Sequence, residues 1–540
     1  LSHAGKVLLG ALALLILAQL AYGKFGRGVE FFPNIEPDAA TVLIHARGNL
    51  SIHEKDLLIQ EIEHKIMDVE GLRTLYTRVG GDPVNNYGIA EDVIGQIHLE
   101  FTAWGTRPSV DSILSEIKTR TANIAGLLIE TEKQKDGPPT GKAVQVQLSS
   151  SFPELLPDAT KIVRGALEEI GGFIDIEDTG ALPGIQWELE VDRAQAAKFG
   201  LDVTTIGQYI RMVTNGLKVA DYRPDDSNEE IDIVLRHTGD RRTLDQLDRV
   251  RIQTDFGSIP VGNFVTRSPQ PAVGTLQRTD QKRSIMVKAD LPPGVNTNLM
   301  VTKLKDWIAT HADQFDPRIE IAFRGEDEKQ KEAADFLVKA FFVALFMMAI
   351  ILVTQFNSFY QAFLILSAVI MSTIGVMLGL LITGQPFGII MSGIGVIALA
   401  GIIVNNNIVL IDTFDQYRHE FKGKMSTREM ILQTGKERLR PVLLTTITTI
   451  LGLMPMVLQI NIDFVGRTVS HGAPSTQWWV QLSTAIAFGL TFSTILTLIV
   501  TPCALMFQDR AVRFFKTLFD RLPLPRRLKK QSHDSSSAAP

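Results

Sequence analysis

The segment Phe387 to Ile411, FGIIMSGIGVIALAGIIVNNNIVLI, contains no charged residue and is mostly aliphatic. A helix needs about 20 predominantly apolar residues to cross the hydrocarbon core of a bilayer. The segment is long enough to do so, although three consecutive asparagines, Asn405 to Asn407, interrupt it. The sequence therefore predicts a membrane-spanning helix that carries a polar patch.

Five further stretches have a similar apolar character. They are Val7 to Tyr22, Phe336 to Phe356, Ala362 to Thr383, Pro441 to Ile460 and Val480 to Phe507. The first is the shortest and also fits a secretory signal peptide, because Lys6 precedes its apolar run and Ala18 and Ala21 follow. Since the sequence begins with Leu1 rather than Met, we favour a spanning helix and expect the chain to be part of a longer protein.

The composition excludes several classes of protein. The chain has 540 residues, a formal net charge of −5 and one cysteine, Cys503. This charge is unlike that of a nucleic-acid binder, and one cysteine allows neither an intrachain disulfide nor a zinc site of four cysteines. No Ser/His/Asp spacing, phosphate-binding loop or HExxH motif is present, so the sequence predicts neither an enzyme nor internal ATP hydrolysis.

Basic residues in short loops indicate how the helices are oriented. Lysine and arginine are abundant between the fourth and fifth predicted helices and after the sixth, whereas residues 384–386 have none and residues 461–479 have only Arg467. The basic loops therefore belong in the cytoplasm. The block of residues 28–332, which joins the first helix to the second, belongs outside it.

This external block has the pattern of a soluble α+β region. Thr41 to Arg47 alternates as a strand, Ser51 and Glu54 form a capping box before an amphipathic helix, and Leu72 to Val79 alternates again. The order of strand, helix and strand recurs at residues 94–131, 143–176 and 284–323. Two such units make one split βαβ (ferredoxin-like) sandwich, so we predict two subdomains with an insertion in the second.

Several short motifs are distributed along the chain. They are Phe31-Phe32-Pro33, Asp192-Arg193-Ala194 with Phe199-Gly200-Leu201, Gly401 to Asp412 (GIIVNNNIVLID), Arg438-Leu439-Arg440-Pro441 and Thr501-Pro502. This set resembles the resistance-nodulation-division (RND) transporters, in the branch that exports hydrophobic and amphiphilic compounds. The resemblance reaches to about residue 508 and fits the C-terminal half of a permease with twelve helices.

The resemblance implies a polytopic α-helical membrane protein with six transmembrane helices and a large periplasmic α+β region of split βαβ subdomains. It divides the chain into residues 1–27 (first transmembrane helix), 28–138 (first porter-like subdomain), 139–185 with 281–332 (second porter-like subdomain), 186–280 (inserted funnel or docking subdomain), 333–507 (five transmembrane helices) and 508–540 (basic cytoplasmic tail). In this family the porter cleft takes up substrate and the docking region faces an exit duct.

The same resemblance implies a function. It predicts a permease of the bacterial inner membrane that exports hydrophobic or amphiphilic small molecules by proton antiport, driven by the proton-motive force without a cofactor. Such a permease is expected to form a homotrimer in the lipid bilayer, with a periplasmic adaptor (membrane fusion) protein and an outer-membrane channel as partners. Two alternatives stay open, namely a lipid or metal-ion exporter of a related RND branch and a non-transporting periplasmic sensor or assembly scaffold.

The polar residues within the membrane helices are the candidates for proton coupling. Seven-residue spacings place Asn405 and Asp412 on one face of the fourth helix, and Arg438 and Thr445 on one face of the fifth. Antiparallel packing then sets Asn405 level with Thr445 and Asp412 level with Arg438. The RND resemblance matches Arg438 and Thr445 to the family's proton-relay arginine and threonine, whereas a simple interfacial ion pair of Arg438 with Asp412 is the structural alternative.

Two features depart from the best-known pumps. Asn405 stands where many of them have a lysine, and an amide cannot act as a cation. In addition, no carboxylate lies deep in any of the six helices, although a proton-coupled carrier needs a group that gains and loses a proton in the membrane. We therefore expect Asn405, Asn406, Arg438 and Thr445, with Asp412 near one end, to face aspartates in a missing N-terminal half.

Weaker signals lie in the external block. Tyr87, Phe101 and Trp104 are candidates for an aromatic uptake cleft, and they fit a core equally well. The histidines do not predict a metal site, because His53 and His64 would lie about 16 Å apart along one helix.

Overall fold

The computed structural model describes residues 3–521 except residue 34 and residues 47–49, 81–91, 135–136, 138–140, 181–184, 225–229, 239–242, 272–275 and 422–423. Side chains are described as far as residue 508, except that of residue 271. The chain divides into two compact units. Residues 1–180 and 277–540 form the first, and residues 181–276 form the second.

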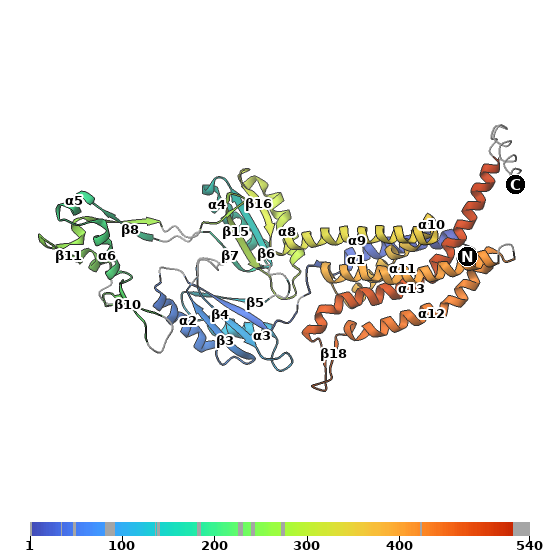
Figure 1. Ribbon diagram of the computed structural model, residues 1–540, viewed down its shortest axis with the longest axis horizontal. Helices are drawn as coiled ribbons and strands as arrows, with labels where there is room; N and C mark the ends of the chain where they lie inside the picture. The colour runs from blue at the N-terminus through green and yellow to red at the C-terminus, as the bar shows by residue number, and fades with distance from the viewer. Residues whose placement is uncertain are drawn as a thin grey trace, which may run out of the picture. The chain divides into compact units, whose positions relative to one another are not determined.

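Six long apolar helices of the first unit have the length and composition of membrane spans, as the sequence predicts. They are α1 (Ala4–Phe25), α9 (Glu326–Phe356), α10 (Phe359–Thr383), α11 (Ile389–Glu420), α12 (Thr427–Val457) and α13 (Pro474–Arg521) (Figure 1). Most are longer than their apolar segments, because hydropathy detects only the part that suits lipid. For example, α12 begins at a capping box of Ser426 and Glu429, 14 residues before Pro441.

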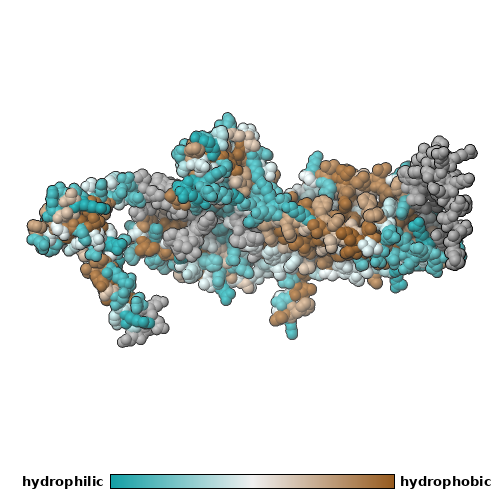
Figure 2. Space-filling view, turned by 45° about the horizontal axis from the view of Figure 1, so that its top comes forward, coloured by the Kyte–Doolittle hydropathy of each residue, from teal (hydrophilic) through white to brown (hydrophobic). Residues whose placement is uncertain are grey.

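Helix α13 packs against α1, α10, α11 and α12. Gly375 and Gly379 of α10 allow close approach, since a Cβ at Gly375 would lie 2.5 Å from the Phe488 carbonyl oxygen of α13, and one at Gly379 would lie 2.5 Å from the Phe488 side chain. In contrast, α9 exposes Phe336, Phe342 and other large apolar side chains. Figure 2 shows a broad hydrophobic surface over these helices, as expected of helices in lipid.

The first α+β layer of this unit contains four strands and two helices. In chain order these are β2 (Ala39–Ala46), α2 (Ile52–Ile66), β3 (Leu72–Val79), β4 (Val93–Phe101), α3 (Val110–Thr121) and β5 (Leu127–Lys133). The strands are antiparallel in the order β3-β4-β2-β5. Apolar residues of both helices, such as Ile59 and Ile117, pack against Val42 and Ile97 of the sheet. The expected capping box of Ser51 and Glu54 begins α2.

The second layer repeats this order of elements. It consists of β6 (Val144–Ser150), α4 (Leu156–Ile170), β7 (Ile174–Asp178), β15 (Lys282–Asp290), α8 (Thr297–Thr310) and β16 (Glu320–Arg324), with β14 (Arg278–Thr279) as a short addition. β15 pairs with β6, β7 and β14, and β6 pairs with β16 on its other side. Val163 of α4, Leu304 of α8 and Val146 of β6 lie in its core.

The first unit also contains short paired strands outside its two α+β layers. β1 (Val29–Glu30) pairs in parallel with β17 (Phe387–Gly388), which directly precedes α11, and β18 (Ile460–Asp463) forms a hairpin with β19 (Thr468–His471) between α12 and α13.

The second unit has its own small core, which includes Ile206, Ile252 and Phe264. Its elements are β8 (Ile185–Val191), α5 (Arg193–Lys198), α6 (Val203–Val213), β9 (Leu217–Tyr222), β10 (Ile231–Leu235), α7 (Leu244–Arg249), β11 (Arg251–Thr254), β12 (Gly257–Pro260) and β13 (Val265–Pro271). They form three antiparallel strand pairs, β8 with β13, β9 with β10 and β11 with β12.

Candidate functional site

The three asparagines of α11 have different surroundings. The side chain of Asn407 is fully buried, whereas Asn406 is half-buried and Asn405 is exposed. Nδ2 of Asn407 donates to the Ile403 carbonyl and to Oγ1 of Thr497, both at 3.2 Å. Its Oδ1 accepts a hydrogen bond of 3.0 Å from Oγ1 of Thr501. Asn407 therefore joins α11 to α13. The candidates chosen from the sequence were Asn405 and Asn406, and Asn407 was not among them.

A row of buried hydroxyl groups on α13 provides the partners of this contact. Thr494, Thr497 and Thr501 follow a helical spacing and are all buried. Oγ1 of Thr494 lies 3.0 Å from Oγ1 of Thr446 on α12. This threonine spacing is visible in the sequence and is the signal that could have identified Asn407.

Arg438 connects α12 to α11. Its Nε donates a 2.7 Å hydrogen bond to Oγ1 of Thr413, which itself donates to the Val409 carbonyl at 2.8 Å. Asp412 is exposed and accepts a hydrogen bond of 3.1 Å from Nε2 of Gln416. Arg438 was expected to lie level with Asp412, and it contacts the next residue, Thr413. The register of the two helices at this point therefore agrees with the prediction to within one residue. However, the described residues contain no ion pair between Asp412 and Arg438, because the guanidinium contacts the neighbouring threonine.

The other expected neighbours, Asn405 and Thr445, do not bind each other. Thr445 is exposed, and its Oγ1 donates to the Val442 carbonyl of its own helix at 3.0 Å. In the described part of the chain no hydrogen bond joins Thr445 to Asn405. Asn405, Asp412 and Thr445 therefore all lie on the surface of this bundle.

Of the aromatic residues proposed for an uptake cleft, Phe101 and Trp104 lie in the described part of the chain. Phe101 is 5% exposed, belongs to the core of the first layer and packs under the Arg107 guanidinium, 5.0 Å from its ring centroid. Trp104 is half-buried, and Tyr87 lies outside the described residues. Neither Phe101 nor Trp104 lines the cavity described next.

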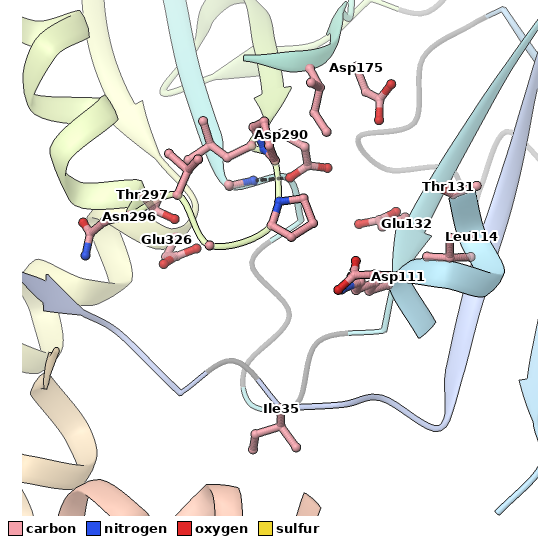
Figure 3. A pocket seen from close by; sticks show the side chains of 18 of the residues that line it. Ile35, Asp111, Leu114, Thr131, Glu132, Asp175, Asp290, Asn296, Thr297 and Glu326 are labelled. Atoms are coloured by element: carbon pink, nitrogen blue, oxygen red, sulfur yellow. Dashed lines mark hydrogen bonds and ion pairs between the residues drawn. The ribbon is translucent and has the colours of Figure 1, made fainter. Parts of the chain in front are cut away.

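A cavity of about 540 Å³ lies between the two α+β layers. One wall comes from α3 and β5, and the opposite wall comes from β7, the loop of residues 290–297 and the first residue of α9. Figure 3 shows Asp111 and Glu132 on one side of it, and Asp290 and Glu326 on the other. Residues 30–33, Ile35, Gln134 and Ala143 also line it.

A buried network of charged side chains also connects the two layers. His45 of β2 donates from Nδ1 to Asp92 (2.9 Å), and its Nε2 lies 3.3 Å from Glu130 of β5. Lys142, next to β6, places its Nζ 2.6 Å from Glu130 and 3.4 Å from Glu177 of β7. Nζ of Lys288 on β15 lies 3.7 Å from Glu177. Three cationic side chains thus face three carboxylates, which balances the buried charge.

His45 carries a proton on both ring nitrogens, because each of them faces a carboxylate that can only accept. Burial alone would lower the pKa of His45, but its hydrogen bonds to Asp92 and Glu130 raise it to about 9. Burial would likewise raise the pKa of Glu130, but His45 and Lys142 hold it below its ordinary value. The network therefore contains ionised groups at neutral pH.

His45, Glu130 and Glu177 have ligand atoms within 4.8 Å of one another, which is close enough to hold a metal ion. The ammonium group of Lys142 already lies against both glutamates. A divalent cation would add charge to a network that is already balanced, so we assign no metal to this cluster.

Replacement of His45 by glutamine is expected to flatten the dependence of stability on pH. Since the pKa of His45 is about 9 in the folded protein and about 6.5 when unfolded, its contribution is complete below pH 6.5 and is lost as the pH rises through about 9. The loss amounts to about 3 kcal/mol. Melting of the detergent-solubilised protein from pH 6 to 10 measures this. Equal slopes for wild type and His45→Gln would contradict it, and exposed His53→Gln is the control.

Comparisons with known proteins agree with this architecture. A model of the AcrB/AcrD/AcrF family matches residues 1–508. The chain is 23% identical over 521 residues to the multidrug resistance protein MdtC of Enterobacter sp. (strain 638), which covers 94% of this chain and 47% of that protein. Two crystal forms of a heavy metal efflux pump share the fold, each with a TM-score of 0.74 and 20% identity over 94% of this chain and 51% of the pump.

Six apolar helices and an α+β region with this likeness define a multi-pass membrane protein. The chain belongs to the AcrB/AcrD/AcrF family of RND efflux permeases. It spans about half the length of the relatives it matches.

Proposed function

We propose that this chain provides one half of an inner-membrane RND permease that exports hydrophobic or amphiphilic compounds by proton antiport. A second six-helix half would supply the carboxylates that carry protons. The name of the relative MdtC, a multidrug resistance protein, supports amphiphiles as substrates. The relatives' lengths, about twice that of this chain, support a second half.

The observation that carries this proposal is the polar surface of α11 and α12. Asn405, Asp412 and Thr445 are exposed on helices that otherwise have the composition of membrane spans. An unpaired amide in hydrocarbon costs on the order of 1 kcal/mol or more, so such a surface is stable where protein or enclosed water covers it. A second half that covers this surface would be in direct contact with these residues.

We assign the proton relay to Asn405, Asn406, Arg438 and Thr445, with Asp412 at its end. A proton moving through the membrane supplies about 2.3 kcal/mol per 100 mV. Protonation of acids in the second half would change their attraction to the guanidinium group of Arg438. The contact of Arg438 with Thr413 and the bonds of Asn407 to α13 would transmit that change through the bundle.

The two α+β layers would be the porter subdomains, and their antiparallel strand orders suit split βαβ sandwiches. The second unit, residues 181–276, corresponds to the insertion predicted at residues 186–280 and would form the docking subdomain. We place both in the periplasm, in a homotrimer that works with an adaptor protein and an outer-membrane channel. No cofactor is proposed.

Export by the complete permease in liposomes tests the proposal. With an imposed pH gradient, transport of a neutral fluorescent amphiphile such as N-phenylnaphthylamine is expected, and a protonophore should abolish it. Failure to transport any hydrophobic or amphiphilic compound would contradict the proposal. Transport of Zn²⁺ or Cu⁺ instead would establish the metal-exporting alternative, which the likeness to a heavy metal efflux pump makes worth including.

A further inference from the structure

The β18–β19 hairpin lies at one end of the helical bundle, between α12 and α13 (Figure 1). The spans of these two helices end at Val457 and begin at Pro474, so the hairpin lies at the depth where the hydrocarbon core of a bilayer ends. Gln477 of α13 holds its base, because its Nε2 donates to the Gly472 carbonyl at 2.9 Å. Oε1 of Gln477 accepts from the amide of Glu36, which precedes the first α+β layer, at 3.0 Å. The hairpin is therefore at the end of the bundle that joins this layer.

The strand pairing of the hairpin separates apolar from polar side chains. Ile462 pairs with Val469, and Asp463 pairs with Thr468. Directly paired residues share a face, and neighbours along a strand alternate between faces. One face therefore carries Ile460, Ile462, Val469 and His471, and the other carries Asn461, Asp463, Thr468 and Ser470. This alternation is typical of a hairpin that has one face against an apolar medium and the other in water.

The turn of the hairpin presents two large apolar side chains. Phe464 is 85% exposed and Val465 is 96% exposed. The turn nevertheless has a defined shape, because Oδ1 of Asp463 accepts hydrogen bonds of 2.9 Å from the amides of Val465 and Gly466. Turns in water are mostly built from glycine, proline and small polar residues. The exposed phenylalanine and valine therefore indicate a partner that covers them.

The neighbouring surface of α12 favours lipid as this partner. The helix exposes a row of large apolar side chains within about 60° around its axis. They are Leu444, Ile447, Leu451 and Leu458. Thr445, on the surface that we propose a second half covers, lies about 100° or more away from this row. The row thus suits a lipid-facing side of α12, and it ends at Leu458, directly before the hairpin.

Charged and aromatic side chains near the turn suit a phospholipid surface. Arg467 is exposed and is the single arginine or lysine between Val457 and Trp479. A guanidinium group binds phosphate through charge-assisted hydrogen bonds. The Asp463 carboxylate, in contrast, already accepts from two amides of the turn. Trp479 is exposed near the start of α13, as expected of an aromatic side chain at a membrane interface.

We infer that the β18–β19 hairpin inserts its turn and its apolar face into the phospholipid leaflet on the side of the α+β layers. Phe464 and Val465 enter the boundary of the acyl chains, Arg467 binds lipid phosphate, and the polar face stays in water. The hairpin thereby anchors the ends of α12 and α13 in the membrane interface. This inference requires only that the bundle spans a membrane, and it is independent of the compound that is exported.

Spin labels on the hairpin test this inference. Val465→Cys, Val469→Cys and Thr468→Cys place a label on the turn, the apolar face and the polar face of the complete permease, whose other reactive cysteines are replaced by serine. The three residues are exposed, and Thr468→Cys is the matched control because it lies next to Val469 on the opposite face. The labelled protein is reconstituted into vesicles of phosphatidylethanolamine and phosphatidylglycerol. Oxygen concentrates in lipid, whereas a neutral nickel chelate stays in water. The ratio of collisions with oxygen to collisions with the chelate should therefore be several-fold higher for Val465→Cys and Val469→Cys than for Thr468→Cys.

A charge at the turn provides a second measurement. Phe464→Asp, combined with the label of Val465→Cys, should lower the collision ratio several-fold, because a carboxylate resists transfer into lipid. Thr468→Asp adds the same charge on the polar face and should leave the ratio of that label unchanged.

A label on Val465→Cys that the nickel chelate reaches freely in these vesicles would overturn the inference. Equal collision ratios for Val469→Cys and Thr468→Cys would also overturn it. A label on Val465→Cys that neither reagent reaches would mean that the turn packs against protein, such as a second half or another copy of the chain, and would equally reject lipid as its partner.

Discussion

Replacement of Arg438 by alanine is expected to reduce proton-driven export at least tenfold while the protein still folds. Arg438 is half-buried and donates to Thr413 of the neighbouring helix, whereas Lys436 and Arg440 of α12 are exposed. A hydrogen bond to a charged group contributes about 1.5–3 kcal/mol, and about 1.4 kcal/mol corresponds to a tenfold change in rate. Under the proposed relay, the loss of the charge of Arg438 adds to this effect.

Transport of a fluorescent amphiphile into liposomes with an imposed pH gradient measures the effect. Arg440→Ala is the matched control, because it removes an exposed arginine two residues away and should keep at least half of the rate. Arg438→Lys retains a charge without the planar guanidinium and should fall between the two. Wild-type rates and an unchanged pH profile for Arg438→Ala would remove Arg438 from the mechanism.

Much of the membrane architecture could be predicted from hydropathy, because about 20 apolar residues in a row have few alternatives to a spanning helix. The apolar segments located all six helices. They did not locate the ends, since α12 begins at Thr427 within a charged stretch and its start depends on capping by Ser426 rather than on hydropathy. The antiparallel register of α11 and α12 followed from the seven-residue spacings to within one residue, as the contact of Arg438 with Thr413 shows.

Which asparagine faces inward could not be predicted from the run of three. Successive residues differ by about 100° around a helix, so Asn405 and Asn407 point in very different directions. Which of the two faces the interior of the bundle depends on where the neighbouring helix lies. Asn407 faces the interior, where Thr497 and Thr501 of α13 form hydrogen bonds with its side chain. Resemblance pointed to Asn405, which lies on the surface that we propose a second half covers.

The buried network was not predicted, because its members come from distant parts of the sequence. His45 and Lys288 are separated by most of the external block, and no local pattern links them. A partial signal was present, since Glu130 directly follows the apolar run of residues 127–129 in β5 and Lys288 directly follows residues 285–287 in β15. Charged residues at such positions indicate a partner across an interface, although they do not identify it.

Replacement of Lys142 by methionine is expected to destabilise the contact between the two α+β layers by about 3–5 kcal/mol, because it leaves two buried carboxylates without their shared cation. Lys142 is 3% exposed and lies 2.6 Å from Glu130 and 3.4 Å from Glu177. Amide hydrogen exchange in β5 and β7, followed by mass spectrometry of the complete protein, should accelerate at least 100-fold.

Two variants separate the effect of charge from that of packing. Lys161→Met removes an equally long cation from the surface of α4, where its partner Asp158 is also exposed, and should change exchange little. Lys142→Met combined with Glu130→Gln removes one cation and one carboxylate, so it should recover a large part of the lost protection.

If the double variant exchanges as fast as Lys142→Met, shape rather than charge balance holds the layers together. If Lys142→Met itself exchanges like the wild type, the network does not connect them. Slow exchange in the double variant would instead mean that opening of the cavity between the layers requires separation of buried charges. Under the proposed proton antiport, movement of the membrane helices would have to supply that free energy.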